Sequence, residues 1–145
     1  METLKKSANG LYRHFAQINT IHNFSNGYAL SGGSFELGVN EACFWFYHII
    51  CENQDFLSSF VFQNWTLKKV GGHEYLIVVR DEKGAMIYSQ VFINSEFMFD
   101  ELIVLVVKRL ILLPSEFQYY QTSAQKNQPF SIKKMSSEEF CFSFN

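Results

Sequence analysis

The chain contains little proline, little cysteine and no long uninterrupted apolar run. Two prolines in 145 residues indicate little linker character. The three cysteines, Cys43, Cys51 and Cys141, lack metal-ligand spacing, so we expect them to behave as small apolar residues. Residues 102–113 form the most apolar stretch, but two basic residues interrupt it and it is too short to cross a bilayer. These absences argue against a disulfide framework, a structural zinc site and a membrane span, and no cofactor is expected.

Charge is sparse and nearly balanced. Charged residues make up 18% of the chain, and the net charge is −2. The basic residues occur mostly as dispersed pairs, such as Lys68-Lys69 and Lys108-Arg109, without a continuous basic stripe. Nucleic-acid binding is therefore disfavoured. Residues 1–10 also lack the apolar core of a signal peptide, so we expect a cytoplasmic protein.

Aromatic residues are abundant. Sixteen Phe, seven Tyr and two Trp make up 17% of the chain, and apolar residues in total make up 48%. Each buried ring removes roughly 150–250 Å² from water, so these residues can fill a core without disulfides or metals. The alternative is that some rings lie outside, on a surface that binds a partner.

The periodicities predict an α+β fold, with an antiparallel sheet of three to five strands packed against a central apolar helix and a second short helix. The central helix is expected to begin at Asn40 and to end near residues 53–55, with apolar positions nearly all round. Short turns separate three predicted strands at residues 60–69, 74–80 and 85–93. Residues 102–110 mix β-branched residues with an acidic start and a basic end, and we predict the second helix there.

The amino-terminal quarter carries weaker signals. Residues 2–15 predict a short helix and residues 18–24 an extended segment. Ser25-Asn26-Gly27 either forms a hairpin turn or places Ser25 as the cap of a short helix. The glycine pair at 32–33 predicts a break in either case.

The predicted strand at residues 85–93 is apolar on both faces. One face would carry Tyr88, Gln90 and Phe92, and the other Val91 and Ile93. We therefore expect either cover on both sides of the sheet or one face that is reserved for a partner.

Composition predicts three parts to the chain: a single α+β domain at 1–120, a polar linker at 121–137 and a terminal strand at 138–145. In that last segment Phe140, Phe142 and Phe144 alternate with smaller residues, which is typical of a strand. Three phenylalanines on one face favour docking on a sheet edge, either in the same chain or in another copy. A homodimer through this strand is thus one expectation.

An apolar run ends at Pro114, and we expect the buried run and the proline to fix the position of Ser115 and Glu116. The favoured interpretation is a cap or turn in which the carboxylate accepts backbone N–H bonds. The alternative is a small hydrolase-type enzyme that uses Ser115 and Glu116 together with Glu96 and Arg13. No nucleophile elbow surrounds Ser115, and the sequence shows no phosphate-binding loop, dinucleotide fingerprint or metal-ligand set.

Four further side chains are candidate ligand or partner sites. Gln63 and Gln90 lie on strands that would be neighbours, where they would either bind a ligand or bond to each other. Trp65 would be either an exposed anchor for a partner or a core ring with its N–H bonded. Arg13 would bind an anion or pair with Glu116 or Glu96.

Three short motifs stand out in the chain: F-Q-N-W-T-L at 62–67, Q-V-F-I-N-S-E-F at 90–97 and L-L-P-S-E-F at 112–117. Together with residues 12–14 and 44–45, their order resembles an uncharacterised bacterial domain family found on chromosomes, plasmids and phages. That family has an F-Q-x-W-x-L strand, a Q-x-I corner leading to T-D-F, and a terminal L-L-P-S-E-Y. The likeness covers roughly residues 11–120.

The chain departs from the family pattern at positions where acidic residues are common. Asn26 stands in place of an Asp, as does His48, and Glu96 replaces another Asp. If the acidic side chains perform chemistry in relatives, this chain should lack it. The resemblance carries no assigned activity, but it implies an accessory or mobile-element role. We therefore expect a non-enzymatic protein-interaction module, for example an inhibitor of a bacterial defence complex similar to an anti-CRISPR protein, with another protein as its partner.

Overall fold

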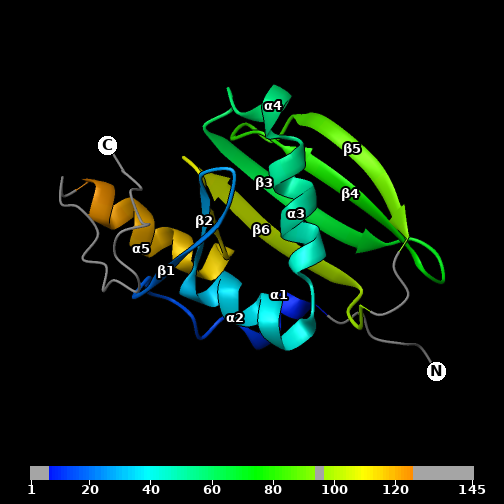
Figure 1. The fold of residues 1–145 in the computed structure, drawn as a ribbon, viewed down its shortest axis with the longest axis horizontal. Helices are drawn as coiled ribbons and strands as arrows, with labels where there is room; N and C mark the ends of the chain where they lie inside the picture. The colour runs from blue at the N-terminus through cyan, green and yellow to red at the C-terminus, as the bar shows by residue number, and fades with distance from the viewer. Residues whose placement is uncertain (1–6, 94–96, 126–145) are drawn as a thin grey trace.

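A computed structural model of the chain describes residues 7–93 and 97–125 and shows an α+β fold (Figure 1). Its helices are α1 (Ala8–Leu11), α2 (Gly32–Glu41), α3 (Phe44–Glu52), α4 (Gln54–Leu57) and α5 (Pro114–Gln125). Its strands are β1 (Ile21–Ser25), β2 (Tyr28–Ser31), β3 (Phe62–Lys69), β4 (Glu74–Arg80), β5 (Met86–Ile93), β6 (Glu101–Val107) and β7 (Leu110–Leu112). No helix in the described part of the chain is long and apolar enough to cross a membrane.

The described strands form one seven-stranded sheet in the order β1-β2-β7-β6-β3-β4-β5. Five of its pairings are antiparallel, but β2 and β7 run parallel. The sequence-based expectation of a purely antiparallel sheet with three to five strands was therefore wrong. The three strands predicted at 60–69, 74–80 and 85–93 are present as β3, β4 and β5. The additional strands come from the amino-terminal hairpin and from the segment predicted as a second helix.

The predicted helix at residues 102–110 is instead β6, a two-residue turn and the first residue of β7. Strand β6 pairs with β3 over seven residues and with β7 over its last three. Its side chains are buried on both faces, which explains the continuous β-branched run without alternation. The acidic start and basic end, which suggested a helix, are the strand's beginning and the turn at Lys108-Arg109.

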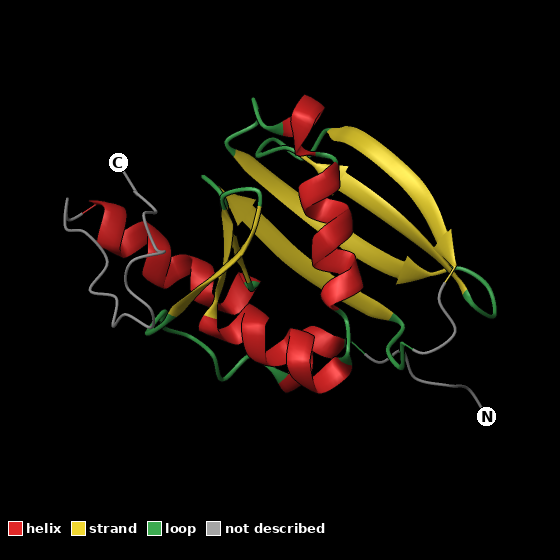
Figure 2. Ribbon diagram, in the orientation of Figure 1, coloured by secondary structure: helices red, strands yellow, loops and turns green. Residues whose placement is uncertain are grey.

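The predicted central helix is present as α3, which begins at Phe44 rather than at Asn40 and ends at Glu52, just before the expected end at residues 53–55. Asn40 instead belongs to α2, which ends at Glu41 and is followed by Ala42 in a left-handed backbone conformation with a φ of 53°. Helix α2 includes the glycine pair at 32–33 that was expected to be a break. Figure 2 shows α3 lying across one face of the strands β3 to β6. Its rings reach the sheet, where Phe46 packs edge-on against Trp65 and Trp45 stacks on Phe92.

The sheet separates two cores, because alternate residues of β6 point to opposite sides. Leu102, Val104 and Val106 join a large core on the side of α1, α2 and α3. Leu105 and Val107 join a smaller core on the other side, beneath α5. Helix α5 covers only the part of this second face that is formed by β1, β2, β7 and β6, and by the beginning of β3. The rest of this face is formed by β4 and β5, and α5 does not cover it.

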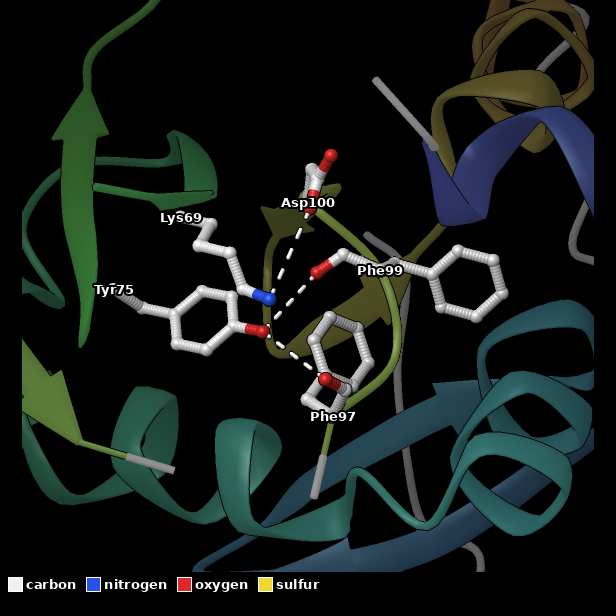
Figure 3. A network of polar contacts seen from close by, with 5 residues as sticks. All are labelled: Lys69, Tyr75, Phe97, Phe99 and Asp100. Carbon is white, nitrogen blue, oxygen red and sulfur yellow. Dashed lines mark hydrogen bonds and ion pairs between the residues drawn. The ribbon is translucent and has the colours of Figure 1, made fainter. Parts of the chain in front are cut away.

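The segment that follows β5 is attached to the sheet by polar contacts (Figure 3). The hydroxyl of Tyr75 donates to the backbone oxygens of Phe97 at 3.1 Å and Phe99 at 3.2 Å. Lys69 lies 4.0 Å from the carboxylate of Asp100 and 5.7 Å from the centre of the Tyr75 ring. Burial, with a smaller effect from Asp100, raises the pKa of Tyr75, so the ring stays a neutral donor. These contacts fix where the chain enters β6.

Candidate functional site

A pocket of about 730 Å³ opens between helix α4 and two hairpin turns, the turn that joins β1 to β2 and the turn that joins β6 to β7. We call it the turn pocket. It is lined by residues from three distant parts of the sequence: Asn26, Tyr28, Cys51, Gln54, Asp55, Ser58, Phe60, Val61, Gln63, Val106, Lys108 and Arg109. Its volume falls within the range of roughly 300–1,000 Å³ that small-molecule sites occupy.

The floor of the turn pocket is a rigid network of amides. Gln54 and Gln63 are both buried, and each donates to the other's side-chain oxygen at 2.9 Å. Gln63 also donates to the backbone oxygen of Leu57 and accepts from the indole nitrogen of Trp65 at 2.9 Å. The hydroxyl of Tyr28 donates to Gln54 at 3.3 Å. The floor is therefore held in place before any ligand arrives.

The rim of the turn pocket is charged. Lys108 and Arg109 are exposed on the β6–β7 turn, and Asp55 is exposed on α4. Burial raises the pKa of Tyr28, and the charge of Arg109 opposes that rise. A Cβ at Gly27 would lie 3.4 Å from an Arg109 nitrogen, so the cation also borders the neighbouring β1–β2 turn.

Ser115 and Glu116 do not form a nucleophile and base. The Ser115 hydroxyl donates to the backbone oxygen of Phe15 at 2.7 Å. The buried Glu116 carboxylate accepts from Ser31 at 2.5 Å, from the Leu113 nitrogen at 2.9 Å and from the Gly33 nitrogen at 3.0 Å. Glu116 thus binds backbone N–H groups at the starts of α2 and α5, the role that the cap or turn interpretation assigned to it.

The remaining sequence candidates are scattered. Strand β4 separates Gln63 on β3 from Gln90 on β5, so the prediction that their strands are neighbours was wrong. Trp65 is completely buried and cannot be an exposed anchor. Arg13 is exposed, whereas all the described donors to Glu116 are uncharged, so the expected Arg13–Glu116 pair is not formed.

Four candidates lie outside the described residues. They are Glu96 and the three phenylalanines of the predicted terminal strand, Phe140, Phe142 and Phe144. Helix α5 includes residues 121–125, the first part of the expected linker. The two described cysteines, Cys43 and Cys51, are buried, and burial raises the pKa of each to about 12. Among the described residues, no group of three or more His, Cys, Asp and Glu is arranged to hold a metal ion.

A second candidate surface lies on the sheet face that α5 leaves uncovered. We call it the open face and define it by Leu76, Val78, Val91 and Ile93. Val91 pairs with Leu76, and Ile93 pairs with Glu74, so these side chains share one side of the sheet. Val91 is 59% exposed and Ile93 is 68% exposed, and none of the four belongs to either core. The sequence predicted either cover on both sides of the sheet or one face that is reserved for a partner. Within the described residues, the open face is not fully covered.

The model of a family of unknown function, DUF6876, matches residues 6–117. The chain belongs to this family. The match includes every residue of the turn pocket and of the open face, and it ends in the first turn of α5 just after Glu116. No curated protein and no solved structure matches the chain.

Sequence reasoning named only Gln63 among the residues of the turn pocket as a candidate. The turn residues Lys108 and Arg109 were noted as one of several basic pairs, and Asn26 as a turn residue. Residues 26–27 are a typical hairpin-turn pair, but Lys108-Arg109 is not, so the sequence offers no signal that connects the two turns. Their shared turn type is seen only in the structure, where both pairs have positive φ.

Proposed function

We propose that this DUF6876 member is a small non-enzymatic interaction module that binds another protein by accepting one of its strands along β5. The observation that carries the proposal is the combination of a free edge with the open face beside it. Within residues 7–93 and 97–125, β5 has a strand neighbour on one side only, and Val91 and Ile93 are exposed on it. Addition of a strand to such an edge is a common mode of protein recognition.

The composition of β5 supports this proposal. Natural proteins protect free edges with charges, prolines, bulges or short strands. Strand β5 spans eight residues and contains neither a charged residue nor a proline. Its one irregularity lies near its start, opposite Val79 and Arg80, and leaves the register from Ser89 to Ile93 regular. The opposite edge, β1, is shorter, with five residues, and has an irregularity near its middle.

The partner's chemistry follows from the face it would cover. Lys68 and Arg80 lie in register with Leu76 and Asn64 on the same side of the sheet as Val78. Both basic residues are exposed, and so is the acidic Glu74, which pairs with Ile93 on the same side. The apolar strip therefore has charges of both signs around it. The proposed partner strand alternates apolar and polar residues, with the apolar ones over Val91 and Ile93. The family resemblance directs the first search towards bacterial cytoplasmic proteins, defence complexes included.

The test compares charge insertions at two exposed sites. The double variant Val91→Lys with Ile93→Lys would place charges on the edge and on the open face. The control is Val39→Lys on α2, because Val39 is also an exposed valine, at 52%. A protein captured from bacterial lysate by the wild type is purified and titrated against each variant. The expected result is one-to-one binding that protects β5 amides from hydrogen exchange, is lost in the β5 variant and persists in the α2 variant. Binding that protects other amides, or that survives the β5 changes, would refute the proposal.

A second copy of the chain is the competing occupant, because residues 138–145 also alternate aromatic and smaller residues. Light scattering on the intact chain, and on a variant with Phe140, Phe142 and Phe144 changed to Ser, separates the two cases. A monomer in both samples agrees with a foreign partner. A dimer that the three changes dissociate would assign the edge to the chain's own terminal strand.

A further inference from the structure

We propose that the turn pocket binds a phosphorylated small molecule, with Lys108 and Arg109 holding its phosphate group. This site lies at the hairpin turns, apart from β5 and the open face, so its failure would leave the proposed function untouched. The argument rests on the charges at the rim, on the backbone that presents them, and on the size and chemistry of the space below.

The two cations occupy backbone conformations that disfavour residues with side chains. Lys108 and Arg109 form a two-residue hairpin turn in which both have left-handed backbones, with φ values of 51° and 71°. Such turns favour Asn-Gly, because other side chains crowd the backbone at positive φ. The neighbouring hairpin has that pair, Asn26-Gly27, with φ values of 54° and 78°. Two turns of one type thus stand side by side, and only one has the residues that suit it.

Backbone strain of this kind is retained where the side chains serve a purpose. Both side chains at the strained turn are cations, and both line the turn pocket. The pocket lining carries two positive charges and one negative charge, from Asp55, on a chain whose net charge is −2. The rim is therefore a local positive site, and the planar donors of an arginine suit the oxygens of a phosphate.

The rest of the lining indicates an organic phosphate rather than a bare ion. The pocket is far larger than a phosphate ion needs, and its walls include the half-buried ring of Phe60 and the exposed side chain of Val61. Asp55 and Ser58 offer acceptor oxygens from α4 and the residue that follows it, which suit hydroxyl or amino groups on a ligand. A sugar phosphate or a nucleoside monophosphate combines these groups: an anion at one end and hydroxyl donors with a ring at the other.

The test is an amide NMR titration of the full chain with three probes: inorganic phosphate, ribose phosphate and AMP. Ionic strength is held constant, because nonspecific attraction between exposed charges depends on salt. The expected result is saturable shifts at residues 26–28, 54–63 and 106–110, with the organic phosphates binding more tightly than inorganic phosphate. Absence of saturation by all three probes up to about 10 mM would overturn the proposal.

Charge-removing variants locate the site. Arg109→Gln should weaken binding of the organic phosphates by about tenfold or more, and Lys108→Gln should weaken it in the same direction. The matched control is Arg13→Gln, since Arg13 is an exposed arginine that does not line the pocket. Equal weakening by Arg13→Gln and Arg109→Gln would overturn the proposal. Amide spectra of each variant without ligand, compared with those of the wild type, show that lost binding does not reflect lost folding.

Discussion

The carboxylate of Glu116 lies 3.0 Å from the backbone nitrogen of Gly33, 83 positions earlier in the sequence. A second oxygen of the same carboxylate accepts from the Ser31 hydroxyl and from the Leu113 nitrogen. One buried acid therefore joins the first turn of α2 to the first turn of α5. It also explains why the Pro114-Ser115-Glu116 segment has a fixed position: the proline starts the helix and the acid secures it.

The ionisation of Glu116 should make stability depend on pH. Burial raises its pKa above the ordinary value of 4.5, while the bonds from Ser31, Leu113 and Gly33 oppose the rise. A raised folded-state pKa means that the stabilising contribution is fully present below pH 4.5 and is lost as the pH rises through the folded-state pKa. The free energy of unfolding, measured by urea titration, should therefore carry a Glu116 contribution that falls as the pH rises above 4.5.

The control for this prediction is Glu116→Gln, which cannot ionise. The variant should be less stable than the wild type at every pH. Its NH2 group is a donor and cannot accept from the Gly33 N–H, and a lost buried hydrogen bond costs about 1–3 kcal/mol. The gap in unfolding free energy between wild type and variant should narrow as the pH rises. A gap that widens with pH would mean that the hydrogen bonds outweigh burial and that the pKa of Glu116 is lowered.

Gly33 should not tolerate a side chain. A Cβ there would lie 2.7 Å from a Glu116 oxygen and 2.9 Å from the Cβ of Phe15. Gly33→Ala should therefore lower the free energy of unfolding by about 1–3 kcal/mol, despite the better helix propensity of alanine. Gly10→Ala in α1 is the matched control, because nothing lies within 4 Å of its Cβ. Equal stability of the two variants in thermal and urea unfolding would contradict the close approach.

The buried amide pair of Gln54 and Gln63 should matter more than the half-buried amide of Gln90 on β5. Gln63→Met keeps the shape of the side chain but removes the hydrogen bonds that Gln63 makes with the Gln54 amide and with the Trp65 N–H. The expected loss is about 2–3 kcal/mol in the free energy of unfolding. Gln90→Met is the control, since Gln90 is half-buried and bonded to Tyr88. A loss at Gln90 as large as at Gln63 would show that strand position, not the amide network, sets the cost.

Local patterns predicted the elements whose partners are close in sequence. Strands β3, β4 and β5 are joined by short turns, so alternation and turn residues were enough to find them. Strand β6 was mistaken for a helix because its longer pairing is distant in sequence: over seven residues it pairs with β3, whereas its nearby partner β7 pairs with only three. The charges at its ends favoured a helix, and only pairing across the sheet decides against it.

The same limit applies to the glycine pair at 32–33 and to the turn pocket. Gly33 was interpreted as a break, but its absent side chain makes room for Glu116, and that reason lies in another part of the chain. The turn pocket gathers residues 26–28, 51–63 and 106–109, so only Gln63 could be suspected before the fold was known. By contrast, the sequence predicted the hydrogen bonds that Glu116 accepts from backbone groups, because an acidic side chain near the start of a helix or turn commonly accepts bonds from the N–H groups there.

The strained turn gives the last prediction. Lys108→Asn with Arg109→Gly would copy the Asn26-Gly27 turn beside it, and should raise the free energy of unfolding by about 1 kcal/mol because both positions have positive φ. Lys108→Gln with Arg109→Gln removes the same charges but keeps side chains at both positions, so it should show no such gain. If the phosphate proposal holds, both double variants lose binding while only the first becomes more stable. A stability gain in the glutamine variant would instead assign the cost of the native turn to charge repulsion between Lys108 and Arg109.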